Sequence, residues 1–148
     1  MLLFRRDTVE KFVAILRKKG YKITPQRRAV ITAFLKSDKF ATAQQILDHV
    51  RATNPDMSLD TVYRNLALLV ELGVISEVNT RGKDGNFYEL ITTEHHHHLV
   101  CLNCGKAECL DFCPINCEKL ETASKNGFNI TSHALEFYGY CQNCCAAG

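Results

Sequence analysis

Residues 95–104 read HHHHLVCLNC and residues 141–144 read CQNC, so two Cys-x-x-Cys pairs flank the second half of the chain. A Cys-x-x-Cys turn presents two thiolates together, and two such turns close a tetrahedral four-sulfur site that suits Zn²⁺. One pair alone could be a redox centre, but two pairs in one small segment favour metal. We therefore predict a structural zinc site made of Cys101, Cys104, Cys141 and Cys144.

The four consecutive histidines precede the first cysteine pair directly. Their run is internal and is bracketed by Glu94 and Leu99, which argues against a purification tag. Alternate residues of a strand face the same side, so we expect the second and fourth imidazoles, His96 and His98, to point together. His95 and His97 then point to the opposite side. The run therefore favours metal binding outside the four-thiolate site.

Composition limits the class of protein. The chain has 148 residues, 46% of them hydrophobic and 23% charged, which suits one globular domain or two small ones. No stretch approaches the roughly 20 apolar residues of a membrane-spanning helix, so we expect a cytoplasmic protein with no membrane partner. Its eight cysteines are then metal ligands or redox groups rather than a disulfide framework.

The net charge of +2 hides an asymmetry between the two halves of the chain. Residues 1–83 carry 15 lysines and arginines against 8 acidic residues, whereas residues 84–148 carry 3 against 8. A basic first half indicates a polyanionic partner such as nucleic acid. Basic helices are also common as plain solvated surface, so charge alone does not decide between the two.

Apolar periodicity and capping residues predict four helices in the first half. The first runs from a Thr8 cap to Lys19, and the second follows a Thr24 cap and reaches about Lys36. The third opens with a capping box at residues 42–45 and ends before Asn54-Pro55. The fourth begins after Ser58 and stops at Gly73.

After the fourth helix the pattern changes to two strands, residues 74–78 and 86–90, around a basic glycine-containing turn. Helices followed by such a ribbon predict a winged helix-turn-helix domain, with the fourth helix as the recognition helix. Arginine can read guanine and asparagine can read adenine in the major groove. The side chains expected to point outward from this helix are Thr61, Tyr63, Arg64 and Asn65.

The second half is predicted to combine a helix at residues 114–126 with a β-rich run at residues 128–138. The fold class is therefore α+β, with an N-terminal winged helix-turn-helix domain at 1–83 and a small α/β domain at 84–148. We place the hinge between them at about residues 79–86.

Several motifs together resemble the ferric uptake regulator (Fur) superfamily. They are Thr61-Val62-Tyr63-Arg64, the histidine run leading into Cys101-x-x-Cys104-Gly105-Lys106, Ser132-His133, and Tyr138-Gly139-Tyr140-Cys141-x-x-Cys144. The resemblance covers about residues 8–144. It implies a metal-dependent repressor that is not an enzyme and binds inverted-repeat operators in double-stranded DNA as a metal-loaded homodimer. It also implies that Lys22 and Arg27 touch the DNA backbone or minor groove, beside Thr61, Tyr63 and Arg64.

Within this superfamily the chain is most similar to zinc uptake regulators. The uninterrupted histidines and the Cys113-Pro114 pair carry that similarity. Iron sensors often have an acid where this chain has His97, and peroxide sensors carry a histidine near the position of Phe40. We therefore expect a zinc signal, with iron- or manganese-dependent and peroxide-sensing repressors of the same family as the alternative.

The resemblance implies two sites beyond the four thiolates. The regulatory site is expected to hold Zn²⁺, or else Fe²⁺ or Mn²⁺. Glu108 and Asp111 are alternatives to its cysteine ligand, Cys109. Its ligands are expected to be Glu89, His96, His98 and Cys109. A possible third site would use His95, His97, Glu118 and His133.

Two other classes of function compete with a regulator. A zinc hydrolase lacks support, because the sequence has no HExxH motif and no nucleophile elbow. A metal store would explain the ligands but not the basic helical half. The roles of Cys113, Cys117 and Cys145 stay open, as burial, redox chemistry and extra ligation all fit a cysteine.

Overall fold

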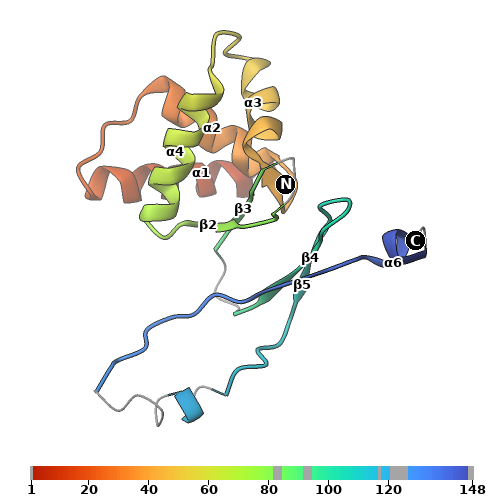
Figure 1. Cartoon of the computed structure of the whole chain (residues 1–148). Coiled ribbons are helices and arrows are strands. Elements are labelled where there is room, and N and C mark those ends of the chain that lie inside the picture. Colours follow the sequence, from red (N-terminus) through yellow and green to blue (C-terminus); the bar gives the residue numbers. More distant parts are fainter. Residues whose placement is uncertain (1, 82–84, 92–94, 117, 121–126, 147–148) are drawn as a thin grey trace. The chain divides into compact units, whose positions relative to one another are not determined.

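The computed structural model describes residues 2–81, 85–91, 95–116, 118–120 and 127–146, with side chains from residue 8 onward. The chain combines helices with two small sheets, which confirms the predicted α+β class (Figure 1). It divides into two compact units. One comprises Met1–Asn79 and Asp84–Ile91, and the other comprises Thr80–Lys83 and Thr92–Gly148. No described helix is long and apolar enough to cross a membrane.

The first unit contains four helices, α1 (Leu2–Lys18), α2 (Pro25–Lys36), α3 (Ala43–Arg51) and α4 (Leu59–Glu71). The predicted start of the first helix was wrong. The helix begins at Leu2 rather than at Thr8, because leucine and arginine propagate a helix well and threonine is tolerated in its interior. The predicted caps of the other three helices are confirmed. Thr24, Thr42 and Ser58 each accept a hydrogen bond from the backbone N–H three residues later.

The apolar faces of these helices form the core of the first unit. Leu16, Ile31, Ile46 and Leu66, one from each helix, are fully buried. Burying such a side chain stabilises a fold by about 1.5–3 kcal/mol before entropy is counted. Figure 1 shows α4 beside α2 and α3, with its outer face pointing away from them.

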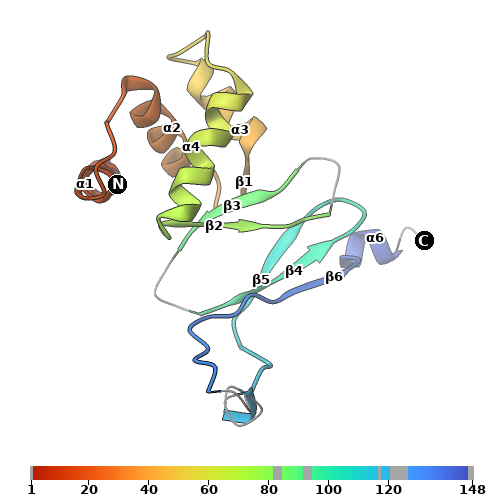
Figure 2. The ribbon, with the colours of Figure 1, turned by 60° about the vertical axis from the view of Figure 1, so that its left-hand side comes forward.

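A three-stranded sheet completes the first unit, in the order β1-β3-β2 (Figure 2). It consists of β1 (Ala41–Thr42), β2 (Ile75–Val78) and β3 (Phe87–Leu90). Strand β3 pairs antiparallel with both neighbours, so the first unit extends past residue 83, where the sequence placed its end. Strand β1 was not predicted, since two residues carry no readable alternation.

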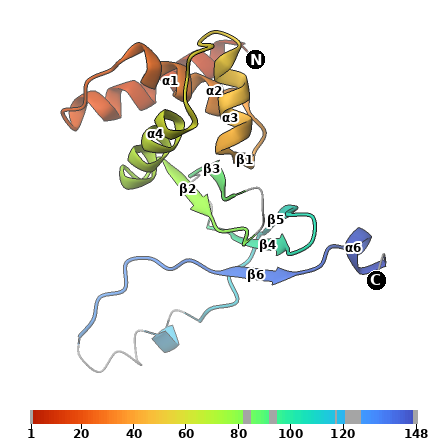
Figure 3. The same cartoon turned by 45° about the horizontal axis from the view of Figure 1, so that its top comes forward.

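The second unit has a sheet in the order β5-β4-β6, followed by a short helix (Figure 3). Its elements are β4 (His97–Cys101), β5 (Ala107–Leu110), β6 (Glu136–Gly139) and α6 (Gln142–Ala146). Strand β4 is central, antiparallel to β5 and parallel to β6. The central strand β4 therefore begins within the histidine run, at His97, and ends at the first cysteine of the first pair, Cys101.

Two predictions for the second unit were wrong in their bounds. Residues 114–116 are not helical, because the Asn116 side chain accepts from the Lys119 N–H at 3.2 Å and so caps a turn that starts later. Helix is described at residues 118–120, and residues 121–126 lie outside the described part. Residues 128–135 are not strand, because the pairing of β6 with β4 begins only at the Glu136–His98 pair.

The capping box of α3 gives a first testable prediction. Thr42 Oγ1 accepts from Gln45 N at 3.2 Å, and Gln45 Oε1 accepts from Thr42 N at 2.9 Å. We expect Thr42→Ala to lower the free energy of unfolding by about 1 kcal/mol, because it removes one half of the box. Thr42→Ser is the control and should stay close to wild type. Equal loss in both variants in urea unfolding would assign the effect to the threonine methyl group instead.

Candidate metal centres

Four cysteine sulfurs converge at the end of the second sheet. Cys101 ends β4, Cys141 precedes α6, and the sulfurs of Cys101, Cys104, Cys141 and Cys144 all lie within 4.8 Å of one another. The Sγ atoms of Cys104 and Cys141 are 3.7 Å apart. A tetrahedral zinc with sulfurs at 2.3 Å has edges of about 3.8 Å, so the spacing fits that ion.

Local backbone structure explains how each pair presents its sulfurs. Gly105 has a φ of 72°, a conformation that favours glycine, and its N–H donates to the Cys101 carbonyl at 2.9 Å to close the first turn. In the second pair the N–H groups of Cys144 and Cys145 both donate to the Cys141 carbonyl, which begins α6. The sequence predicted both turns correctly from the Cys-x-x-Cys spacing.

The electrostatics of this group favour a thiolate at Cys101. The backbone N–H groups of Cys104 and Cys141 lower the pKa of the Cys101 thiol to about 6, and the Cys141 N–H lies 3.4 Å from its sulfur. Asn103 Nδ2 donates to the Cys144 sulfur at 3.3 Å. That bond lowers the pKa of Cys144, but the neighbouring sulfur of Cys141, burial and the other two sulfurs raise it to about 11. Thiolate is the form that binds metal, so the backbone donors prepare Cys101 as a ligand.

A second set of ligands lies on one face of the same sheet. The rings of His96 and His98 are 5.1 Å apart, as expected for alternate residues of a strand. Cys109 lies directly opposite His98 on β5, and Glu136 is in register with His98 on β6. Sheet neighbours in register share a face, so three potential ligand types form one row. The ligand atoms of Cys109 and Glu136 are not grouped within 4.8 Å of those of both histidines. Glu136 was not predicted as a ligand, because the pairing of distant strands is not visible in the sequence pattern.

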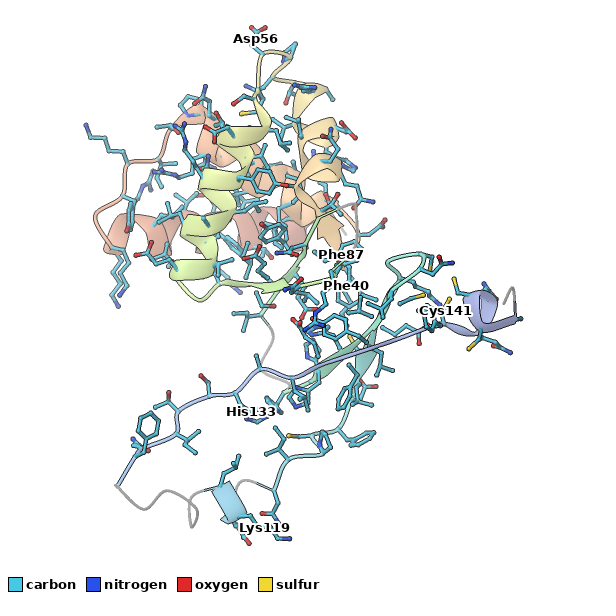
Figure 4. All side chains as sticks on the ribbon, viewed as in Figure 1. Phe40, Asp56, Phe87, Lys119, His133 and Cys141 are labelled. Carbon is cyan, nitrogen blue, oxygen red and sulfur yellow. The ribbon has the colours of Figure 1, made fainter. Side chains whose placement is uncertain are left out.

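Glu89, the remaining residue expected at the regulatory site, lies on β3 in the first unit. Its side chain is buried and its Oε1 accepts a hydrogen bond from Ser76 Oγ at 3.3 Å. Phe40 also belongs to this unit. Its ring centroid lies 6.3 Å from that of Phe87 (Figure 4), so the position supplies an apolar contact rather than a ligand.

A third set of ligands lies at the other end of β6 from the cysteines. Figure 4 shows His133 on the segment leading into β6 and Cys141 after that strand. The Nε2 of His133 is 3.1 Å from that of His95 and 3.4 Å from that of His97. Burial lowers the pKa of His97, and the neighbouring charges of His95 and His133 lower it further. His97 is therefore held neutral, which is its ligand form.

The fourth member of this third set differs from the residue that the sequence favoured. The residues whose ligand atoms lie within 4.8 Å of one another are His95, His97, Cys113 and His133, and Glu118 lies outside this group. The sequence spacing could not find Cys113, because it depends on the path of the chain after β5.

Helix α4 carries three of the five side chains predicted to contact DNA, namely Thr61, Tyr63 and Arg64. Tyr63 is 43% exposed, and Arg64 is exposed and pairs with Asp60 one turn earlier. The prediction that Asn65 points outward was wrong. Asn65 is buried, donates to the Thr61 carbonyl at 2.8 Å, and accepts from Arg27 Nε at 3.1 Å.

Arg27 therefore supports α4 from α2, and its guanidinium also donates to the Lys22 carbonyl. Lys22 is exposed, Arg27 is half-buried and Thr61 is half-buried at the start of α4, where its N–H donates to Ser58. Lys22, Tyr63 and Arg64 are thus the more accessible of the five predicted contacts.

Comparison with known proteins identifies relatives over nearly the whole chain. The family model described as "Ferric uptake regulator family" matches residues 18–138. A ferric uptake regulation protein of Staphylococcus epidermidis is 39% identical over 132 residues, which are 89% of this chain and 92% of that protein. A peroxide-responsive repressor of the same species is 32% identical over 138 residues, covering 92% and 87% of the two chains.

Solved structures agree with the sequence comparison. The ferric uptake regulator of Helicobacter pylori, described as having three functional metal-binding sites, superimposes with a TM-score of 0.76 at 28% identity. The match covers 95% of this chain and 93% of that one.

Proposed function

Because the chain belongs to the ferric uptake regulator family, we propose that it is a metal-dependent transcriptional repressor that binds inverted-repeat operators as a metal-loaded homodimer. The family consists of metal-responsive transcription regulators rather than enzymes. The proposal rests mainly on one observation: the residues suited to DNA contact and most of the residues suited to metal binding lie in different units of the chain. An exposed Tyr63–Arg64 pair lies on a capped helix of the first unit. The second unit holds the four-cysteine group, the group of three histidines with Cys113, and the His96–His98 pair.

The proposed mechanism is thermodynamic linkage. His96, His98 and Cys109 would bind the regulatory metal on the sheet of the second unit, and Glu89 would add a carboxylate from the first. A metal that takes ligands from both units binds one arrangement of them more tightly and shifts the population toward it. If that arrangement is the one that fits DNA, metal tightens DNA binding and DNA tightens metal binding by the same factor.

Zinc is the regulatory metal that we propose. A thiolate opposite His98 favours zinc over manganese, which prefers oxygen ligands. Phe40 offers no ligand atom at the position where peroxide sensors carry a histidine, because its ring is apolar and packs near Phe87. The second candidate is an iron-dependent regulator, which the name of the Staphylococcus epidermidis relative favours. Operator affinity measured at buffered free zinc, iron and manganese separates the two.

DNA recognition by α4 gives a second testable prediction. Within the described part of the chain, Arg64 pairs with Asp60 on the exposed surface. Such pairs contribute little, so the guanidinium is available to a base. If Arg64 reads a guanine, Arg64→Ala should cost about 1–3 kcal/mol of specific binding and relax preference at one operator position. Arg17→Ala on α1 removes the same charge as a control. Equal losses in both variants would indicate a purely electrostatic contribution from Arg64.

A further inference from the structure

Three imidazole nitrogens and one sulfur meet at a single point of the second unit. His95 precedes β4, His97 begins it, Cys113 follows β5 and His133 precedes β6. The His95 Nε2 lies 3.1 Å from the Nε2 atoms of both His97 and His133, and the latter two are 3.4 Å apart. The Cys113 sulfur lies 3.3 Å from the His133 Nε2. Four separate segments of the chain thus each place one potential metal-ligand atom in the same small volume.

These spacings match the edges of a zinc tetrahedron. Zn–N bonds of about 2.0–2.1 Å give N–N edges of about 3.3 Å, and a Zn–S bond of about 2.3 Å gives N–S edges of about 3.6 Å. The observed edges of 3.1, 3.1, 3.4 and 3.3 Å lie within a few tenths of an ångström of those values. A site of this size is too small for six oxygen-type ligands around a larger ion.

Hydrogen bonds alone do not explain the arrangement. A neutral imidazole donates through one nitrogen and accepts through the other. Three Nε2 atoms that all face one another at 3.1–3.4 Å cannot form three good hydrogen bonds, since each bond needs one donor and one acceptor. Protonating all three instead would bring three positive charges together. A shared cation, with the protons on the Nδ1 atoms, satisfies all three lone pairs at once.

From this geometry we infer that Cys113, rather than Glu118, closes a three-histidine, one-cysteine site that holds a second zinc ion permanently. Four protein ligands leave no open position, which is the character of structural zinc sites. A neutral nitrogen set with one thiolate selects zinc, or cobalt in its place, over manganese. The ion would tie the segments after β5 and before β6 to β4. This inference goes beyond the proposed function, because the site is filled whether or not DNA is bound.

Zinc content of the full chain tests this assignment, measured off DNA in anaerobic, reducing buffer after removal of loosely held metal. We expect Cys113→Ser and His133→Ala each to lose one zinc per chain. Glu118→Gln and Cys145→Ser, matched controls for carboxylate and thiol, should keep every zinc. With Co²⁺ in place of zinc, Cys113→Ser should also lose thiolate-to-metal charge-transfer absorption. Full zinc retention by Cys113→Ser, or a loss in Glu118→Gln, would overturn the inference.

A measurement on the unmutated protein keeps the inference testable if the Cys113 variant does not fold. Alkylation mapped by mass spectrometry should show Cys113 protected when zinc is bound and reactive after chelation, with the exposed Cys145 reactive in both states. Equal alkylation rates at Cys113 with and without zinc would refute ligation. Because neither measurement involves DNA, failure of this inference is distinct from failure of the proposed repressor.

Discussion

Replacing Cys104 by serine is expected to remove one zinc ion per chain and to unfold the second unit. The four sulfurs join the end of β4 to the start of α6. Strands β4 and β6 pair over only four residues. Binding of a structural zinc is worth about 10–16 kcal/mol in small zinc domains, and this binding energy is folding energy. Losing one thiolate should therefore cost more than a short sheet can supply.

The measurements are zinc content, thermal unfolding and sedimentation. We expect Cys104→Ser to lose one zinc, to unfold at a lower temperature and to lose the proposed dimer. Cys145→Ser, next to the second pair but outside the sulfur group, should match wild type in all three. Unfolding of the first unit should be affected less, because its core is formed by its own helices. A Cys104→Ser protein with full zinc and an unchanged transition would disprove the four-thiolate site.

The sequence was most informative where structure depends on local spacing. The caps Thr24, Thr42 and Ser58 and the two Cys-x-x-Cys turns were predicted because each is decided within a few residues. The alternation of the histidines was predicted for the same reason. Helix α1 shows the limit of this reasoning, because a good capping residue at Thr8 does not force a helix to begin there.

Features that depend on distant segments were not predictable. Strand β1 exists only because Ala41 and Thr42 meet β3, which lies more than 40 residues away along the chain. By residue type Asn65 suits DNA contact, but it is buried and pairs with Arg27 from α2. Cys113 joins the histidines only through the path of the chain between β5 and β6. A single sequence records none of these long-range pairings.

Replacing His98 by alanine is expected to abolish the metal-dependent gain in operator affinity. Allosteric gains of this kind are typically about 5- to 150-fold, and the variant should show none at any free zinc concentration. His98 is the central member of its row, opposite Cys109 and beside Glu136. Removing its imidazole therefore separates the remaining ligands. The four-thiolate zinc and the proposed dimer should persist, since neither uses an imidazole from this face of the sheet.

His49→Ala is the matched control, because His49 is an exposed histidine on α3 whose Nδ1 contacts the Gln45 carbonyl. It should keep the full metal response. If His98→Ala keeps it too, the row on this face of the sheet is not the regulatory site.

A second variant, Cys109→Ser, tests which metal is the regulatory signal. A serine hydroxyl is a poor zinc ligand but is tolerated by manganese, which prefers oxygen. The variant should therefore need a higher free zinc concentration for half-maximal operator binding, while its weaker response to manganese changes little. Equal shifts for the two metals would remove Cys109 from the ligand set.

If the wild type tightens on DNA only with iron or manganese, or if peroxide inactivates it through histidine oxidation, the zinc proposal is wrong. The iron- or peroxide-responsive alternative then takes its place, with the same row of ligands.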